Sequence, residues 1–178
     1  MKKIFFLLFI LIISSSLHLK AFAQDKTVDN TWDNWQFLMG DWVSVQTGEP
    51  GEGTAFFSFY LHLDSNVLYR ADHNEFPATD TRKAFYHDDI LIIYKESSDI
   101  PNKAIYFDNE NHVIHYNIEY PEKNKSIILS SEESKGKPRQ KLSYFLNDDG
   151  SLKIKFELAT PDKPDDFKVH VEGTARKK

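Results

Sequence analysis

Short segments in which every second residue is apolar make up most of this chain. The clearest is the segment 151–159 (SLKIKFELA), where leucine, isoleucine and phenylalanine alternate with lysine and glutamate. A period of two residues is the repeat of a β-strand that buries one face and exposes the other. No long helical segment interrupts these strands, so the pattern argues against a parallel α/β sheet and predicts an antiparallel all-β fold.

Turn-forming residues separate these segments at the spacing typical of a β-sandwich or a β-barrel. Because every connection is short enough for a hairpin, we expect an up-and-down antiparallel barrel of about ten strands, whose closure would remove the free sheet edges. The extended segments expected are residues 41–47, 54–63, 67–76, 83–87, 90–96, 103–107, 112–120, 126–132, 140–146, 151–159 and 167–175.

The N-terminus predicts a secretory signal peptide. A basic start, a ten-residue apolar run at 4–13 and a small-x-small motif at 21–23 follow one another. The apolar run is shorter than the roughly 20 residues of a membrane span, so no span is expected in the mature form. Removal of residues 1–23 would leave 155 of the 178 residues and shift the net charge from −5 to −8. We therefore expect a periplasmic or extracellular protein, with a flexible stretch at 24–30 and one barrel domain at 31–178.

Composition excludes several classes of protein. The chain has no cysteine, which rules out disulfides, cysteine-bound zinc and thiol catalysis. Its acidic balance argues against nucleic acid as a partner, because phosphates would repel it. An exported domain of this kind would depend on packing alone for its stability.

A helical turn is expected directly before the first strand. Thr31 suits an N-cap, and Trp32, Trp35 and Met39 fall on one helical face. Gly40 should end the turn, because glycine tolerates the unusual backbone angles of a sharp passage into a strand.

Strand parity predicts a large aromatic inward face. We expect it to line a cavity for a lipophilic small molecule, although a small barrel can instead fill with its own side chains. Parity does not decide whether Arg70 or His73 points inward. An inward Arg70 would suit an anionic head group, and the alternative is a cross-strand or rim ion pair. The predicted cavity residues are Phe57, Phe59, Tyr69, Arg70, Tyr116, Ile118, Tyr144 and Phe156.

The segment 37–42 (FLMGDW) resembles the opening of lipocalin-like (calycin) barrels, in which a helical turn leads into Gly-x-Trp at the first strand. The resemblance implies that Gly40 and Trp42 close one end of the barrel. In calycins a basic residue near the last strand packs over that tryptophan, and Arg176 occupies the matching position here. The alternative for Arg176 is an ordinary solvated charge.

Strand number and length look like the nitrobindin-like branch of calycins and its exported bacterial relatives. That resemblance implies haem binding through a histidine followed six residues later by arginine, the spacing of His170 and Arg176. The chain departs from the family after its Gly-x-Trp, where residues 43–45 (VSV) replace further glycines. Parity also turns His170 outward with Lys168 and Glu172, so the alternative is a solvated edge histidine.

The chain shows no sequence motif for catalysis. There is no HExxH, Walker loop, GxGxxG or Gly-x-Ser-x-Gly. A zinc site would need histidines converging from separate strands, which the sequence does not reveal. The acid-rich stretches 86–89 (YHDD) and 108–111 (DNEN) are interpreted as turns. We expect no enzyme activity and no metal.

The favoured hypothesis is an exported, non-catalytic binding protein for a small hydrophobic ligand, lipid-like or aromatic, without a cofactor. One alternative is a haem-binding, nitric-oxide-handling barrel that uses His170. The other is a scaffold or interaction module that acts through the loops 48–53, 77–82 and 160–165.

Overall fold

A computed structural model describes residues 31–48 and 52–178. The predicted signal peptide (1–23) and flexible stretch (24–30) lie outside the described residues. Within the described part, no helix has the length and apolar character needed to cross a membrane.

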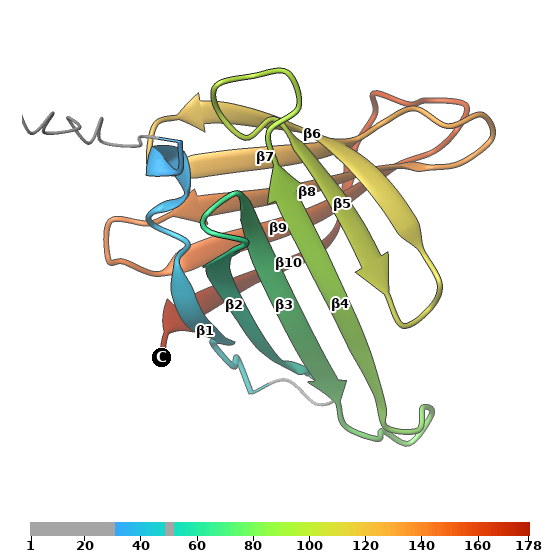
Figure 1. Ribbon diagram of the computed structural model, residues 1–178. Coiled ribbons are helices and arrows are strands. Elements are labelled where there is room, and N and C mark those ends of the chain that lie inside the picture. The colour runs from blue at the N-terminus through green and yellow to red at the C-terminus, as the bar shows by residue number, and fades with distance from the viewer. Residues whose placement is uncertain (1–30, 49–51) are drawn as a thin grey trace, which may run out of the picture.

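Ten antiparallel strands form a closed barrel in up-and-down order, with β1 paired to both β2 and β10 (Figure 1). The prediction of an all-β, ten-stranded up-and-down barrel is confirmed. The strands are β1 (Gly40–Ser44), β2 (Thr54–His62), β3 (Val67–Phe76), β4 (Phe85–Tyr94), β5 (Lys103–Asp108), β6 (Val113–Glu122), β7 (Ser126–Ser131), β8 (Arg139–Leu146), β9 (Leu152–Ala159) and β10 (Lys168–Lys177).

Residues 83–96 fold differently from the two extended pieces that the sequence predicts. They contribute a single ten-residue strand, β4. Asp88 pairs with His73 and Asp89 pairs with Asp72, so both acids belong to the strand ladder. The interpretation of this acid-rich stretch as a turn is therefore wrong.

The N-terminal helical segment is shorter than its pattern predicts. One 3-10 turn forms, η1 (Asp33–Trp35), and Trp32 rather than Thr31 precedes it, with no side-chain capping bond. Two indole groups fix the turn instead. Trp32 Nε1 donates to the Ser65 carbonyl at 2.8 Å, and Trp35 Nε1 donates to the Tyr120 hydroxyl at 2.9 Å. Tertiary hydrogen bonds thus replace the expected local cap.

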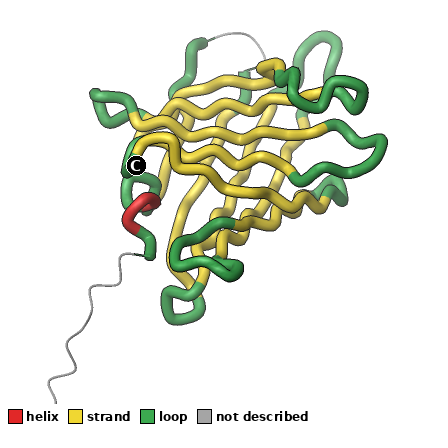
Figure 2. Tube along the Cα trace, turned by 90° about the horizontal axis from the view of Figure 1, so that it is seen from above, coloured by secondary structure: helices red, strands yellow, loops and turns green. Residues whose placement is uncertain are grey.

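One half of the barrel interior is a packed core, which we call the packed end. Trp35, Trp42, Phe59 and Tyr144 are at most 1% exposed, and the Phe59 ring meets those of Trp35 and Tyr144 at 6.2 and 5.6 Å. Figure 2 shows η1 on the same side of the molecule as the C-terminus. The aliphatic part of this core is Leu38, Leu68, Leu91, Ile93, Ile127, Leu129 and Leu152.

The other half of the barrel, the open end, is less completely closed, because β1 is short. β1 and Val45 meet β10 from Thr174 onward. Among the described residues, 168–173 therefore pair with β9 alone, while β2 to β4 run on past β1 (Figure 1). A β-bulge between Val169 and Val171 bends β10 here. Val171 pairs with Phe156 on the inner face and is 57% exposed, so solvent reaches that face.

Candidate functional site

Three aspartates stand side by side on the inner face of β3, β4 and β5. The register pairs Asp72 with Asp89 and Asp89 with Asp108, and we call these three residues the acidic row. Their side chains are 14%, 6% and 3% exposed. Like charges at directly paired positions destabilise a sheet, and buried charges need partners. A fold that keeps three of them together points to a functional site.

The guanidinium of Arg70, which is 4% exposed, compensates part of this charge. Nη2 donates to Asp89 and lies 3.2 Å from Asp72 Oδ2, and Nη1 donates to the Tyr144 hydroxyl across the barrel. Of the two roles predicted for Arg70, the ion pair is the one observed. Burial would lower the pKa of Arg70, but Asp89, Tyr144 and Asp72 raise it well above its usual value, so the group stays charged.

Two members of the acidic row differ in how readily they take up a proton. Burial raises the pKa of Asp72 to about 6, against the opposing effect of Arg70. Burial would also raise the pKa of Asp108, but the backbone N–H groups of His112 and Glu110, together with the His112 ring, lower it. Near neutral pH both carboxyls are ionised, and mild acid protonates Asp72 before Asp108.

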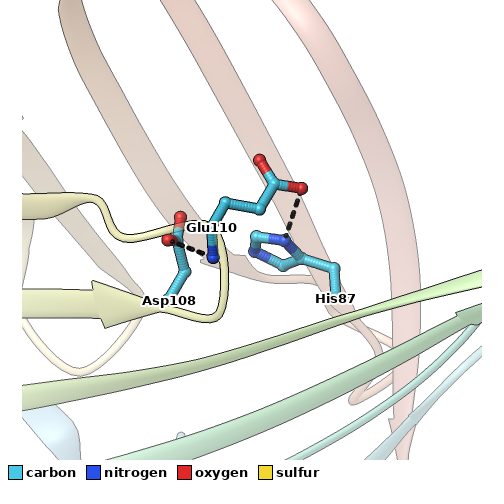
Figure 3. A group of neighbouring side chains, drawn as sticks. All are labelled: His87, Asp108 and Glu110. Carbon is cyan, nitrogen blue, oxygen red and sulfur yellow. Dashed lines mark hydrogen bonds and ion pairs between the residues drawn. The ribbon is translucent and has the colours of Figure 1, made fainter.

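A histidine and a second carboxylate extend the acidic row toward the solvent. His87 on β4, Asp108 at the end of β5 and Glu110 in the following turn form what we call the mouth cluster (Figure 3). Glu110 Oε1 lies 3.5 Å from His87 Nδ1, and one ligand atom from each of the three residues lies within 4.8 Å of the others. Imidazole nitrogen and carboxylate oxygen are ligands that transition metals accept.

Tyrosine hydroxyls join these groups to one another. Tyr106 donates to Asp108 Oδ2 at 3.3 Å, and its oxygen lies 3.0 Å from His87 Nε2. Burial raises the pKa of Tyr106, and it raises the pKa of Tyr144 to about 12. Both hydroxyls are therefore neutral hydrogen-bonding groups at physiological pH.

Apolar side chains occupy parts of the inner face outside β3 to β5. Ile154, Phe156 and Leu158 of β9 are half-buried, as is Ile114 of β6, and Val171 of β10 is exposed. We call these five residues the apolar wall. The inner face at the open end therefore has an acidic wall on β3 to β5 and an apolar wall mainly on β9 and β10.

Most of the predicted cavity residues lie in the packed core. Phe57, Phe59, Tyr116, Ile118 and Tyr144 are each at most 9% exposed. Their rings and side chains fill the barrel from β2, β6 and β8. In the predicted set, Phe156 is the half-buried member that lies at the open end.

Tyr69 does not lie with the other predicted cavity residues. It is the neighbour of inward-facing Arg70, so the strand pleat turns it to the outer face. There it pairs with exposed Tyr60 and meets the His62 ring edge-on at 5.3 Å. The prediction that both Tyr69 and Arg70 line the cavity is wrong for Tyr69.

Barrel closure uses Gly40 and Trp42 but not Arg176. Gly40 has a φ of 99°, which lies in the region that favours glycine. Trp42 Nε1 donates to the Leu38 carbonyl at 2.8 Å. The register pairs Trp42 with Lys177, whose Nζ lies 5.4 Å from the centre of the indole ring. Arg176 pairs with outward-facing Val43 and binds Asp149 at 2.8 Å, so the predicted contact falls to Lys177.

His170 lies in the β10 bulge. The bulge leaves it between Val169 and Val171 without a ladder partner, and its ring meets that of Phe156 edge-on at 6.0 Å. Strict alternation along β10 would turn His170 away from the inner face. In a β-bulge, however, two residues lie opposite one residue of the neighbouring strand, and here His170 and Val171 lie opposite Phe156. The bulge removes the basis of the parity argument at this position, and haem ligation by His170 stays a prediction.

A hollow of about 670 Å³ lies over β1 to β5. Its lining residues come in triplets such as 71–73 and 88–90, whose first and third members face outward, and none comes from β6 to β9. The hollow is therefore on the outside of the barrel. Phe56 and Phe107 are apolar side chains at its surface.

Sequence reasoning missed the acidic row and the mouth cluster. Both acid-rich stretches stood out in the sequence, but each was interpreted as a turn. Only the pairing of Asp89 with Asp108 brings the two stretches together. Arg70 and Asp72 in β3 are spaced two residues apart, as are His87 and Asp89 in β4. Each pair therefore shares one face of its strand, and aligning the two hairpin strands would have brought the pairs together.

Neither the protein-family models nor the curated proteins compared with this chain match it.

Proposed function

We propose that this protein is an exported, non-catalytic binding protein of calycin-like type that holds a small amphipathic amine at the open end of its barrel. The observation that carries the proposal is the division of the inner face into the acidic row and the apolar wall. A hydrocarbon body fits the apolar wall, and an ammonium group fits the carboxylates.

Charge decides between kinds of head group. The acidic row and Glu110 bring four carboxylates to this end, and Arg70 is the guanidinium among them. An anionic head group, such as that of a fatty acid, would meet net negative charge, whereas an ammonium group would relieve the repulsion within the row.

Arg70 also offers a donor to an oxygen of the ligand. Its Nε is buried and has no hydrogen-bond partner among the described residues. A buried donor without a partner destabilises the fold by about 1–3 kcal/mol, so a ligand oxygen that accepts this N–H gains affinity. Amino alcohols therefore rank above simple amines as candidates.

Binding of three matched compounds tests the proposal. Octylamine, octanol and octanoate share one hydrocarbon chain and differ in the charge of the head group. Calorimetric titration in the presence of EDTA should give the order octylamine, octanol, octanoate, with octanoate about tenfold or more weaker than octylamine. Equal binding of all three, or preference for octanoate, would refute the role of the acidic row.

Neighbouring aspartates on opposite faces of β4 supply a matched pair of variants. Asp89→Asn removes one of the three carboxylates of the acidic row, whereas Asp88→Asn removes an exposed carboxylate that contacts His73 on the outer face at 2.5 Å. Octylamine affinity should fall in Asp89→Asn and stay unchanged in Asp88→Asn. Far-ultraviolet circular dichroism of both variants establishes that each is folded.

Haem is the second candidate ligand, favoured by the bulge that brings the His170 ring against Phe156. Exposed Val171 pairs with Phe156 beside this imidazole and offers apolar surface to a porphyrin. His170 would be the iron ligand, and haem would supply nitric-oxide binding. A Soret band on titration with hemin, lost in His170→Ala, supports this candidate, and the lack of a band removes it.

A further inference from the structure

We propose that the mouth cluster of His87, Asp108 and Glu110 is a binding site for a divalent transition metal of the zinc type. The three residues come from β4, the end of β5 and the β5–β6 turn, and their ligand atoms converge within 4.8 Å (Figure 3). The amine and metal sites share Asp108 and Glu110, but the metal site needs neither the apolar wall nor Arg70, and the amine is tested in EDTA.

Contacts on the far side of the His87 ring support the metal site. Nε2 lies 3.0 Å from the Tyr106 hydroxyl and 3.7 Å from Asp89 Oδ2. Metal-binding histidines characteristically give their second ring N–H to a carboxylate or hydroxyl group, which fixes the ring orientation. With the proton on Nε2, the lone pair of Nδ1 faces Glu110, where a cation is stabilised.

Hydrogen bonds also hold Asp108 in place. Its Oδ1 accepts the backbone N–H groups of Glu110 and His112 at 3.0 and 2.8 Å, and its Oδ2 accepts from Tyr106. Metal-ligating carboxylates are usually hydrogen-bonded in this way. Glu110 has a side chain that is 58% exposed, so the site opens to solvent and a metal ion can enter.

The ligand set indicates the class of metal. An imidazole nitrogen with two carboxylate oxygens suits zinc and its neighbours, whereas calcium and magnesium prefer oxygen ligands alone. Three protein ligands leave a fourth position for water, which is the arrangement of an open zinc site.

Metal titration of the tag-free full chain, stripped with EDTA and dialysed, tests the inference. Calorimetry with zinc chloride should show one site per chain, and calcium chloride should bind more weakly by about tenfold or more. Cobalt(II) should give visible absorption bands that zinc abolishes. Ring ¹⁵N spectra should show a metal-induced shift at Nδ1 of His87.

Two glutamates that each contact a histidine provide the matched variants. Glu110→Gln removes a carboxylate of the mouth cluster and should weaken zinc binding about tenfold or more. Glu75→Gln removes a carboxylate that lies 3.1 Å from His73 Nε2, while Asp88 lies at the opposite ring nitrogen. Those two carboxylates flank the ring and do not converge, so zinc affinity should be unchanged.

Tyr106→Phe separates a positioning role from a structural one. It removes the hydroxyl beside His87 Nε2 and should weaken zinc binding about tenfold while the melting temperature without metal changes little. No zinc binding by the wild-type chain, tighter binding of calcium, or equal losses in Glu110→Gln and Glu75→Gln would each overturn the inference. None of these results bears on octylamine binding in EDTA.

Discussion

At the scale of single residues, the acidic row and Arg70 form a cluster of buried charges that destabilises the fold unless the charges remain paired. Asp72, Asp89 and Asp108 occupy paired positions on three adjacent strands, and the Arg70 guanidinium contacts two of them. A buried ion pair adds little to stability over an apolar pair, but loss of one partner leaves a buried charge unpaired. The residues of the row should therefore be sensitive to changes that leave the rest of the barrel intact.

Replacing Arg70 by methionine should destabilise the protein strongly. The variant Arg70→Met leaves Asp72 and Asp89 without their cation, and the free energy of unfolding should fall by about 3–5 kcal/mol. Urea unfolding followed by tryptophan fluorescence measures the change. Arg176→Met, which breaks an exposed pair with Asp149, serves as the control and should change stability by about 0–1 kcal/mol. Similar small losses in both variants would contradict the account.

Replacing Asp72 by asparagine should make the protein more stable at neutral pH. Because the folded pKa of about 6 lies above the unfolded value, native Asp72 holds its proton more tightly than the unfolded chain does. The protonated Asp72 side chain therefore stabilises the fold at pH values below the unfolded pKa, and this stabilisation is lost as the pH rises toward 6. Relative to wild type, Asp72→Asn should gain about 1–3 kcal/mol at about pH 7.5 and less at about pH 4.

Urea unfolding of both proteins at the two pH values measures this difference. Hydrogen bonds lower the pKa of Asp149 to about 2, so this group makes stability depend on pH in the opposite direction. Because Asp149 is present in both proteins, its effect cancels in the comparison with wild type. If Asp72→Asn raises the free energy of unfolding equally at both pH values, or lowers it at neutral pH, then the pKa of Asp72 is not raised in the folded protein.

At the scale of elements, the shortness of β1 determines which end of the barrel is open. β1 has five residues and pairs with the last part of β10, while β10 itself continues for ten residues. Alternation of apolar residues predicted most strand positions, since it reflects the pleat directly. It did not locate the β10 bulge or the inward face of β3, because the bulge shifts parity and both faces of β3 are mixed.

Hydrogen exchange should divide β10 into two parts. Amides of residues 168–173 that point away from β9 should exchange much faster than amides of residues 175–177 that point toward their partners in β1. Residues 142 and 144 of β8, a strand paired on both sides, provide the protected reference. Uniform protection along β10 would contradict an open end.

At the scale of the whole molecule, the barrel combines a filled end with an end that solvent reaches. The alternation of apolar and polar residues predicted the strands, and the short connections between them predicted hairpins and hence an up-and-down barrel. It did not predict the candidate site. Asp89 and Asp108 are nineteen positions apart in the chain, and only the β4–β5 register brings them together. Residues that converge from separate strands leave no periodic signal in the sequence, so such a site is recognised only in the tertiary structure.

The position of a bound amine on the barrel shows whether the acidic row and the apolar wall form one binding site. Nuclear Overhauser contacts between octylamine and a ¹³C-labelled protein, recorded in EDTA, locate the ligand residue by residue. We expect contacts from the alkyl chain to Ile114, Ile154 and Phe156, with the carbon next to the nitrogen near the acidic row. Contacts confined to Phe56 and Phe107 in the outer hollow, or no contacts with the inner face, would contradict it.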